Sequence, residues 1–200
     1  MSVSYRRVRD QITDLLREEI MIGVLEEGAP LREVNLAKRF KVSRGPIRDA
    51  ILQLNHEGLL DTQPNRGARV GRVWDQRLRP IMMRIRLELE NFGLQELIRR
   101  GSKLNIAPFR NNLRHFEIAC RDEDLPAVVR LDMAFHRMIL QESGHPGLES
   151  VWLLIMGGMR LPYSRHKKLS QSHAEHKLII DALEQGLEKE ALAALKANIH

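Results

Sequence analysis

Apolar residues recur every three or four positions along most of the chain, and this period predicts amphipathic helices. Three such segments are expected near the N-terminus. The first ends at Gly23, the second is very short and covers residues 36–40, and the third begins after Ser43 and ends at Gly58. Serine is a residue type typical of helix N-caps, and glycine is typical of helix ends.

The pattern changes after the third segment. Residues 59–62 and 68–70 are strand-like and flank a turn formed by residues 64–67, which predicts a β-hairpin. Three short helices followed by a hairpin are the order of a winged helix-turn-helix. The sequence therefore predicts a first domain over residues 1–73.

Strand signals are absent beyond Asp75, and residues 74–200 are expected to form an all-helical bundle. Glycine and proline clusters separate the helical stretches. The helices are expected at about 75–99, 104–120, 123–142, 147–166, 170–185 and 188–199. The predicted fold is mainly α, with an N-terminal winged helix followed by a helical domain.

Composition excludes several classes of protein. The chain is 43% hydrophobic and 29% charged, which is typical of a soluble globular protein. Its longest apolar stretch, Val151–Met159, is much shorter than the roughly 18 residues that a membrane span requires. Cys120 is the single cysteine, which excludes an intrachain disulfide and a cysteine-rich zinc site. No secretory signal is recognisable, so a cytoplasmic location is expected.

Positive charge is concentrated locally. The formal net charge is +6, and residues 38–48 contain five basic and no acidic residues. On a helical wheel, Arg44 and Arg48 lie on one polar flank beside Asn55, away from the apolar face. Two guanidinium groups at the start of a helix suit guanine edges or phosphates, and Arg66 and Arg69 on the hairpin suit the backbone or minor groove. The alternative is a solvated basic surface.

This part of the chain resembles the winged helix of the GntR family. The resemblance rests on Leu31-Arg32-Glu33, Leu36-Ala37, residues 42–51, Leu54, Glu57-Gly58-Leu59 and residues 65–70. It implies that Arg44 and Arg48 contact DNA, that Ser43 binds a phosphate, and that the Arg66-Gly67 tip enters the minor groove.

The chain departs from the family pattern at one position. Val34 stands where the family often has an arginine that touches DNA. Either that contact is missing, or Arg32 replaces it.

Polar residues occupy apolar stripes in three of the later helices. Asp132 and His136 lie one turn apart on the core-facing side of their helix, and His176 lies in the middle of an apolar face. Asn198 faces inward in the last helix. A carboxylate and imidazoles that point the same way can bind one metal ion. The alternative is a buried Asp–His hydrogen-bonded pair without metal.

The helical part is similar to the FCD ligand-binding domain of FadR-type GntR proteins. Asp132-x-x-Phe135-His136, Glu175-His176 and Arg86-x-x-Leu89-Glu90 carry this resemblance. It implies an Asp-His-His-His metal site, in which Asp132, His136 and His176 match three ligands. Asn198 occupies the fourth position, where it offers a neutral amide oxygen, and His173 is an outside candidate. Zinc is the favoured ion, with nickel or manganese as alternatives given the oxygen ligands.

The same resemblance assigns Arg86 to the effector. Its guanidinium would bind a carboxylate in a bidentate manner. The alternative is a surface ion pair with Glu90, four residues further along the helix.

Together these features predict a ligand-responsive transcriptional regulator, a repressor and not an enzyme. As a homodimer it would bind a pseudo-palindromic operator in double-stranded DNA, and a small organic acid would act as its effector. Two alternatives stay open. One is a metal-dependent hydrolase or lyase with a DNA-targeting module, and the other is a metal-free acyl-CoA sensor.

Overall fold

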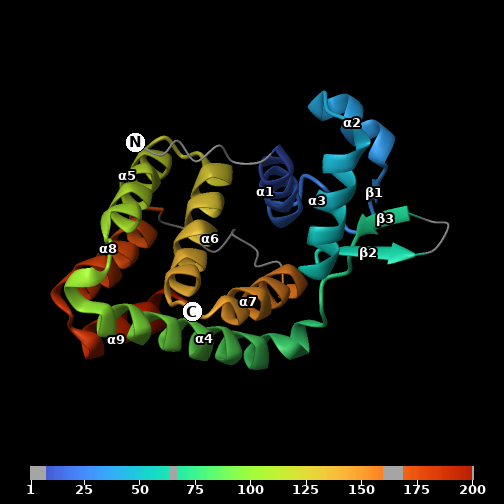
Figure 1. The fold of residues 1–200 in the computed structure, drawn as a ribbon. Helices are drawn as coiled ribbons and strands as arrows, with labels where there is room; N and C mark the ends of the chain where they lie inside the picture. Colours follow the sequence, from blue (N-terminus) through green and yellow to red (C-terminus); the bar gives the residue numbers. More distant parts are fainter. Residues whose placement is uncertain (1–7, 64–66, 160–168, 200) are drawn as a thin grey trace. The chain divides into compact units, whose positions relative to one another are not determined.

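The chain divides into two compact units. The computed structural model describes residues 8–63, 67–159 and 169–199 (Figure 1). One unit comprises residues 1–76 and 153–161, and the other comprises residues 77–152 and 162–200. Both units contain fully buried apolar residues.

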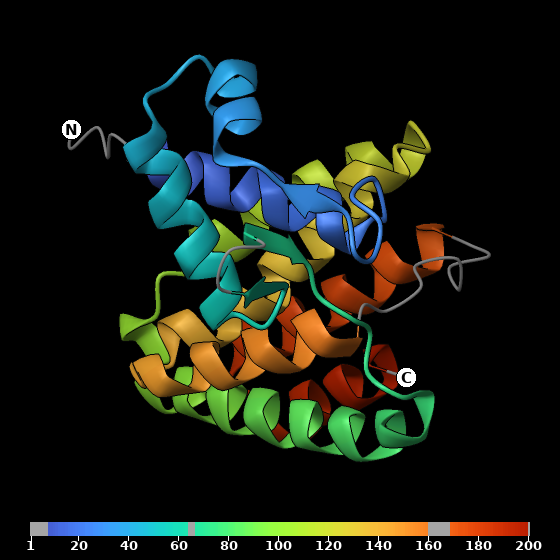
Figure 2. The ribbon, with the colours of Figure 1, turned by 90° about the vertical axis from the view of Figure 1, so that its right-hand side faces the viewer.

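The first unit contains a helix-turn-helix and a small sheet. Figure 2 shows α2 and α3 joined by a short turn and running in different directions. The elements in chain order are α1 (Val8–Met21), β1 (Pro30–Leu31), α2 (Glu33–Phe40), α3 (Arg44–His56), β2 (Leu60–Gln63) and β3 (Gly67–Val70). This order confirms the predicted winged helix.

The apolar face predicted for α3 is buried. Ile47, Ala50 and Leu54 have no exposed surface, and α3 packs against α1, in which Leu16 is also fully buried. A partly buried ion pair also links α1 to the end of α3: Arg17 donates to both carboxylate oxygens of Glu57, the C-cap of α3, each at 2.7 Å. The α1–α3 pair therefore holds the exposed side of α3 in a fixed orientation.

The hairpin belongs to a three-stranded antiparallel sheet of order β1-β3-β2. No strand was predicted in the segment that precedes α2, but Pro30 and Leu31 pair with Arg69 and Ala68. Two residues are too few to show the alternation of a strand in sequence, so this strand becomes visible only through its pairing.

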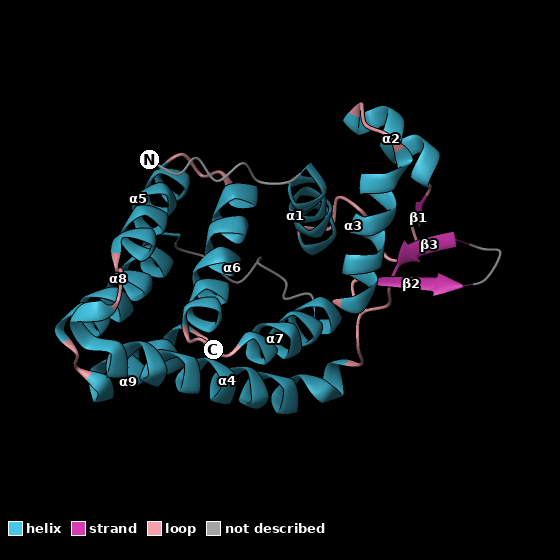
Figure 3. Ribbon diagram, viewed as in Figure 1, coloured by secondary structure: helices cyan, strands magenta, loops and turns pink. Residues whose placement is uncertain are grey.

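The second unit is entirely helical among its described residues, as the distribution of strands in Figure 3 shows. Its elements are the 3₁₀ turns η1 (Gln76–Leu78) and η2 (Gly101–Lys103), and the helices α4 (Arg79–Arg100), α5 (Ala107–Arg121), α6 (Leu125–Glu142), α7 (Pro146–Met159), α8 (Leu169–Gln185) and α9 (Glu188–Asn198). The first residues of α7 belong to this unit and its last residues to the other. No helix in the described ranges has the length and apolarity needed to cross a bilayer.

Several helix boundaries differ from expectation by two to four residues: α2 begins at Glu33 and not at 36, α5 at Ala107 and not at 104, and α6 at Leu125 and not at 123. The helix expected from residue 75 begins with η1, and α4 starts only at Arg79, with a proline in its first turn. The helix expected over 147–166 is present as α7 up to Met159, and residues 160–166 lie outside the described residues.

The core of the helical unit forms where α5 packs on α6 and α8, and where α4 and α8 pack on α9. α4 and α6 approach closely at Gly93, where a Cβ atom added to the glycine would lie only 3.2 Å from Ile139 Cγ2. The fully buried residues of this core include Leu94, Leu97, Phe109, Phe135, Ile139, Ile179, Ile180, Ala191 and Leu195.

Neighbouring residues on α8 offer a test of this packing. Ile179 has no exposed surface, whereas Leu178 is 60% exposed. We predict that Ile179→Ala lowers the free energy of unfolding of the helical unit by about 2–5 kcal/mol, because it leaves a cavity. Leu178→Ala should change it by no more than about 0.5 kcal/mol. Denaturant unfolding monitored by circular dichroism measures both, and equal effects would contradict the described packing.

Candidate functional site

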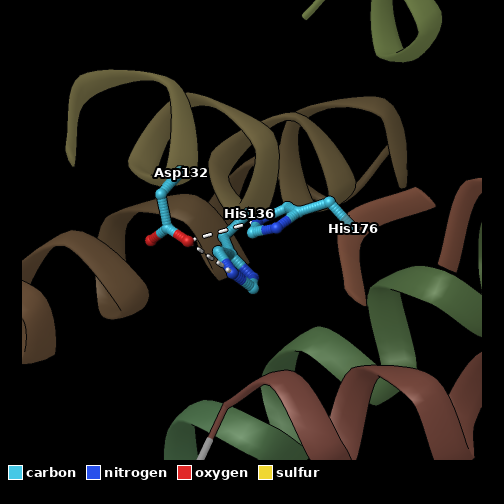
Figure 4. A group of neighbouring side chains, drawn as sticks. All are labelled: Asp132, His136 and His176. Carbon is cyan, nitrogen blue, oxygen red and sulfur yellow. Dashed lines mark ion pairs between the residues drawn. The ribbon is translucent and has the colours of Figure 1, made fainter. Parts of the chain in front are cut away.

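Three potential metal ligands converge inside the helical unit. Asp132 and His136 lie on α6, His176 lies on α8, and all three are buried. Their ligand atoms lie within 4.8 Å of one another, and no other such group of histidine, cysteine and acidic residues occurs among the described residues. Asp132 Oδ1 is 3.2 Å from His176 Nε2 and 3.8 Å from His136 Nε2. Figure 4 shows the Asp132 carboxylate facing both rings.

Local structure brings these residues together. The side chain of Asp124 accepts a hydrogen bond from the Ala127 backbone N–H and so caps the start of α6. The spacing of four residues then places Asp132 and His136 on the same side of that helix. The ring of Phe135 lies 4.7 Å from the ring of His176 in an edge-to-face arrangement. Aromatic contact therefore limits the rotation of His176.

The orientation of each imidazole follows from its hydrogen-bond partners. His176 Nδ1 lies 2.7 Å from the carbonyl oxygen of Ser172. A carbonyl oxygen only accepts, so Nδ1 of His176 carries the proton. His136 Nδ1 lies 2.5 Å from Oε2 of Glu90, a fully buried residue on α4. Burial would raise the pKa of Glu90, but His136 and Arg86 lower it to about 2, so this carboxylate also accepts.

In their neutral forms, both rings therefore direct the unprotonated Nε2 towards Asp132. Burial would raise the pKa of the Asp132 carboxyl, but His176, His136 and Arg86 hold it well below its usual range. Protonated imidazoles that donate from Nε2 can balance the ionised carboxylate. When both rings are neutral, the carboxylate and the two nitrogen lone pairs repel one another unless a cation lies between them.

The ligand set fits a divalent metal ion. Ligand atoms bound to one tetrahedral zinc ion lie about 3.3 Å apart, given bond lengths of about 2.0–2.2 Å. The distances of 3.2 and 3.8 Å between Asp132 Oδ1 and the two Nε2 atoms lie close to this value. All the ligand atoms lie within 4.8 Å of one another, so binding of one ion would require the widest pair to approach by up to about 1.5 Å.

The two further metal candidates have different surroundings. Asn198 is half-buried, its Nδ2 donates to Glu175 Oε2 at 3.3 Å, and its Oδ1 is buried without a hydrogen-bond partner. An unsatisfied buried carbonyl oxygen is available to a ligand. His173 is half-buried and does not belong to the three-residue group.

Arg86 forms the expected ion pair, but the pair is not on the surface. Its Nε donates to Glu90 Oε1 at 2.8 Å, and the two side chains are only 4% and 0% exposed. The sequence alternative of a surface ion pair was wrong because the side of α4 that carries both residues faces the core. The other oxygen of Glu90 contacts His136, so Arg86 is linked to the three ligands through Glu90.

A second candidate site is a basic groove in the first unit. The groove has a volume of about 680 Å³ and is formed by α2, α3 and the sheet. Arg32, Arg44, Arg48, Gly67 and Arg69 line it, which brings together most of the predicted DNA-contacting residues. The exposed Val34 is also part of its lining.

Three further observations concern the residues predicted to contact DNA. Ser43 is exposed and is the N-cap of α3 as expected, but its side chain makes no capping hydrogen bond. Arg69 donates to the carbonyl oxygen of Gly28 at 2.9 Å. Arg66 lies outside the described residues.

Glu33 partly neutralises the groove. Its carboxylate accepts hydrogen bonds from Arg44 Nη2 at 2.9 Å and from Arg48 Nη2 at 3.3 Å. The guanidinium groups of Arg48 and Arg44 lower the pKa of Glu33, so the carboxylate is ionised at neutral pH. The basic stretch seen in the sequence is therefore paired in space with an acidic residue from the preceding helix.

Sequence reasoning assigned no role to Glu33, and it treated Glu90 only as part of a motif and as an ion-pair partner. Both are charged residues on helices; the partners of Glu33 lie on another helix, and so does His136, the partner that links Glu90 to the site. Periodicity identifies the face of a residue but not the residue opposite it. In the sequence, only the spacing of four residues between Arg86 and Glu90 indicated a partner for either glutamate.

The pairing of Glu33 generates a prediction for the basic groove. We predict that Glu33→Gln raises the affinity of the chain for random-sequence duplex DNA about two- to fivefold, because it releases Arg44 and Arg48 from an exposed ion pair. Glu26→Gln removes the same charge from an exposed turn of the same unit and serves as the control. Fluorescence anisotropy at fixed salt measures both, and an equal gain for the two variants would show that only net charge matters.

Known proteins resemble both units. Residues 8–70 match the model for "Bacterial regulatory proteins, gntR family", and residues 82–200 match that for the "FCD domain". The transcriptional repressor RspR of Escherichia coli is 29% identical over 134 residues, which cover 67% of this chain and 58% of that protein. The gluconate operon repressor of Bacillus subtilis is 27% identical over 137 residues, which cover 68% and 56%. The aligned region is thus less than two thirds of either relative.

The solved structure of E. coli McbR/YncC shares the fold, with a TM-score of 0.77 at 23% identity; the match covers 96% of this chain and 92% of that one. The two relatives named above are described as transcriptional repressors, and neither is described as a hydrolase or lyase. Since the FCD match alone spans more than half of the chain, the protein belongs to the GntR family of bacterial regulatory proteins and carries an FCD domain.

Proposed function

We propose that this protein is a transcriptional repressor whose helical unit binds a divalent metal ion together with a small organic acid. The observation that carries the sensor part is the convergence of Asp132 Oδ1 with the Nε2 atoms of His136 and His176. The effector changes DNA binding to the extent that it binds one of two conformations more tightly. The FadR-type subfamily is part of this proposal.

The basic groove of the first unit is the proposed DNA surface. Arg44 and Arg48 on α3 contact base edges or phosphates in the major groove, and Ser43 binds a phosphate. Arg32 takes the place of the family arginine that is absent at Val34. Arg69 and Gly67 contact the backbone or minor groove, together with Arg66 as the family resemblance implies.

The active form is proposed to be a homodimer on a pseudo-palindromic operator. Support comes from α4, where Ile81, Ile85 and Phe92 lie within about 40° of one another on the helix and are 45%, 38% and 40% exposed. A row of exposed apolar residues on one helix face suits a second copy of the chain. A dimer also doubles the DNA contacts of a small winged helix.

Zinc is the proposed ion, with nickel or manganese as alternatives. Two imidazoles favour zinc or nickel, whereas the Asp132 carboxylate and the amide oxygen of Asn198 add oxygen ligands that manganese accepts. When bound, the metal would act as a Lewis acid that holds the carboxylate of the effector. The convergence of three ligands favours this mode over a metal-free acyl-CoA sensor.

Arg86 is the proposed second contact for the effector. It is buried, is linked to the three ligands through Glu90 and carries a permanent positive charge. A guanidinium group offers five N–H donors, so one group can serve Glu90 and also a carboxylate ligand. A metal ion and an arginine at one site select a small anion.

The DNA assignment is tested on a duplex that the wild-type protein selects from a random pool. We predict that Arg44→Ala and Arg48→Ala each weaken binding about tenfold to a hundredfold, because a base-reading arginine contributes roughly 1–3 kcal/mol. Arg121→Ala removes another exposed charge, from the helical unit, and should leave affinity unchanged. DNase footprinting is expected to show two half-sites about ten base pairs apart. Unchanged affinity for both variants would contradict the recognition-helix assignment.

The metal site is tested by thermal denaturation of chelator-treated protein. We predict that Zn²⁺ raises the melting temperature, and that gluconate or citrate raises it further only when metal is present, because both bind the folded state. Asp132→Asn should remove the shift, whereas Asp122→Asn, an exposed control on the same unit, should keep it. Asn198→His should raise the metal affinity. If neither wild type nor Asn198→His binds metal, the three residues form a hydrogen-bonded cluster and the sensor proposal is wrong.

A further inference from the structure

We infer that Glu90 is the positioning residue of the metal site: its carboxylate selects the form of His136 that can bind a metal ion. This inference rests on the metal part of the proposed function. Glu90 is not one of the proposed ligands and lies on the opposite side of the His136 ring from Asp132, since it contacts Nδ1 whereas Asp132 faces Nε2.

Each hydrogen-bond contact described for the Glu90 carboxylate is with a nitrogen atom that can donate. Oε1 accepts from Arg86 Nε at 2.8 Å and from Trp152 Nε1 at 2.6 Å, and Oε2 lies 2.5 Å from His136 Nδ1. The residue has no exposed surface. A guanidinium and an indole N–H can only donate, so this position requires a group that accepts through both oxygens.

The consequence for His136 is a choice between two neutral tautomers. With the proton on Nδ1, the ring donates to Glu90 and presents a lone pair on Nε2 to Asp132 and to a metal ion. With the proton on Nε2, the ring would donate to Asp132 and its Nδ1 lone pair would face the Glu90 carboxylate at 2.5 Å, which is strongly repulsive. Among the neutral forms, Glu90 therefore leaves only the one that presents an Nε2 lone pair to a metal ion. A doubly protonated ring would donate to both carboxylates and would lose its Nε2 proton when the metal binds.

This division of roles follows a general property of histidine ligands. A histidine that binds a metal usually donates its other N–H to a carboxylate or carbonyl oxygen, which fixes the ring and raises its basicity. The two histidines meet this requirement differently: His136 uses the Glu90 carboxylate, and His176 uses the Ser172 carbonyl oxygen. Because its acceptor is charged, the Nε2 atom of His136 should be more basic than that of His176 and so the stronger metal ligand.

The direct test is Glu90→Gln. An amide has one acceptor oxygen, so its NH₂ group must face one of the three donors. We expect Zn²⁺ affinity, measured by isothermal titration of metal-depleted protein, to fall about 10- to 100-fold. Glu88→Gln changes the same charge at an exposed position of α4 and should leave the affinity unchanged. Trp152→Phe removes one donor but keeps the Glu90–His136 contact, and should change the affinity by less than about threefold.

A second measurement needs no variant. In ¹⁵N-histidine NMR spectra of metal-depleted wild-type protein, recorded at a pH high enough for the ring to be neutral, His136 should be the Nδ1–H tautomer, and a merely structural role of Glu90 would not require this. An Nε2–H tautomer, or Zn²⁺ binding by folded Glu90→Gln equal to wild type, would overturn the inference. If wild type binds no Zn²⁺, the metal proposal fails, and the NMR spectrum still decides whether Glu90 selects the tautomer.

Discussion

The proposed site of the helical unit depends on one buried carboxylate, that of Asp132, whose charge must be compensated. Asp132 is buried, and its histidine neighbours and Arg86 hold the pKa of its carboxyl well below the usual range; an ionised carboxylate in an apolar environment is costly unless a cation or several donors compensate it. The two imidazoles beside it are themselves fixed by Glu90 and by the Ser172 carbonyl oxygen. A divalent ion satisfies all three ligands at once, and this requirement is the physical basis of the proposed sensor.

Packing supplies the precision that such a site needs. Glu90 and His136 meet across α4 and α6, and three residues further along each helix Gly93 and Ile139 come into close contact. A larger residue at Gly93 would separate the helices and lengthen the contact between Glu90 and His136. The core of the unit therefore determines the geometry of the site as well as the stability of the fold.

In the winged helix, basic residues form ion pairs with acidic residues from other helices. No acidic residue lies between Lys38 and Arg48 in the sequence, yet Glu33 pairs with Arg44 and Arg48, and Arg39 pairs with Glu19. The recognition helix thus presents less free charge than its sequence suggests. Specific DNA must compete with Glu33 for these guanidinium groups.

Helical periodicity predicted the features that depend on a single helix, namely which of its faces is buried. It assigned the inward faces of α3, α6 and α8, and with them the buried positions of Asp132, His136 and His176. It could not find β1, because a two-residue strand has no period, and it could not find the partners Glu90 and Glu33, because each contact joins two helices. For Asn198 it gave the inward face but not the contact with Glu175.

A cation is proposed to lie between the Asp132 carboxylate and the two Nε2 atoms, and the sensor function depends on it. Anomalous diffraction from crystals of the purified protein, collected on both sides of the zinc absorption edge, tests this most directly. We expect a peak in the anomalous difference map between Asp132, His136 and His176, which disappears below the edge. No anomalous peak at this position in crystals soaked with Zn²⁺, and a direct hydrogen bond between Asp132 and a histidine instead, would contradict the proposal.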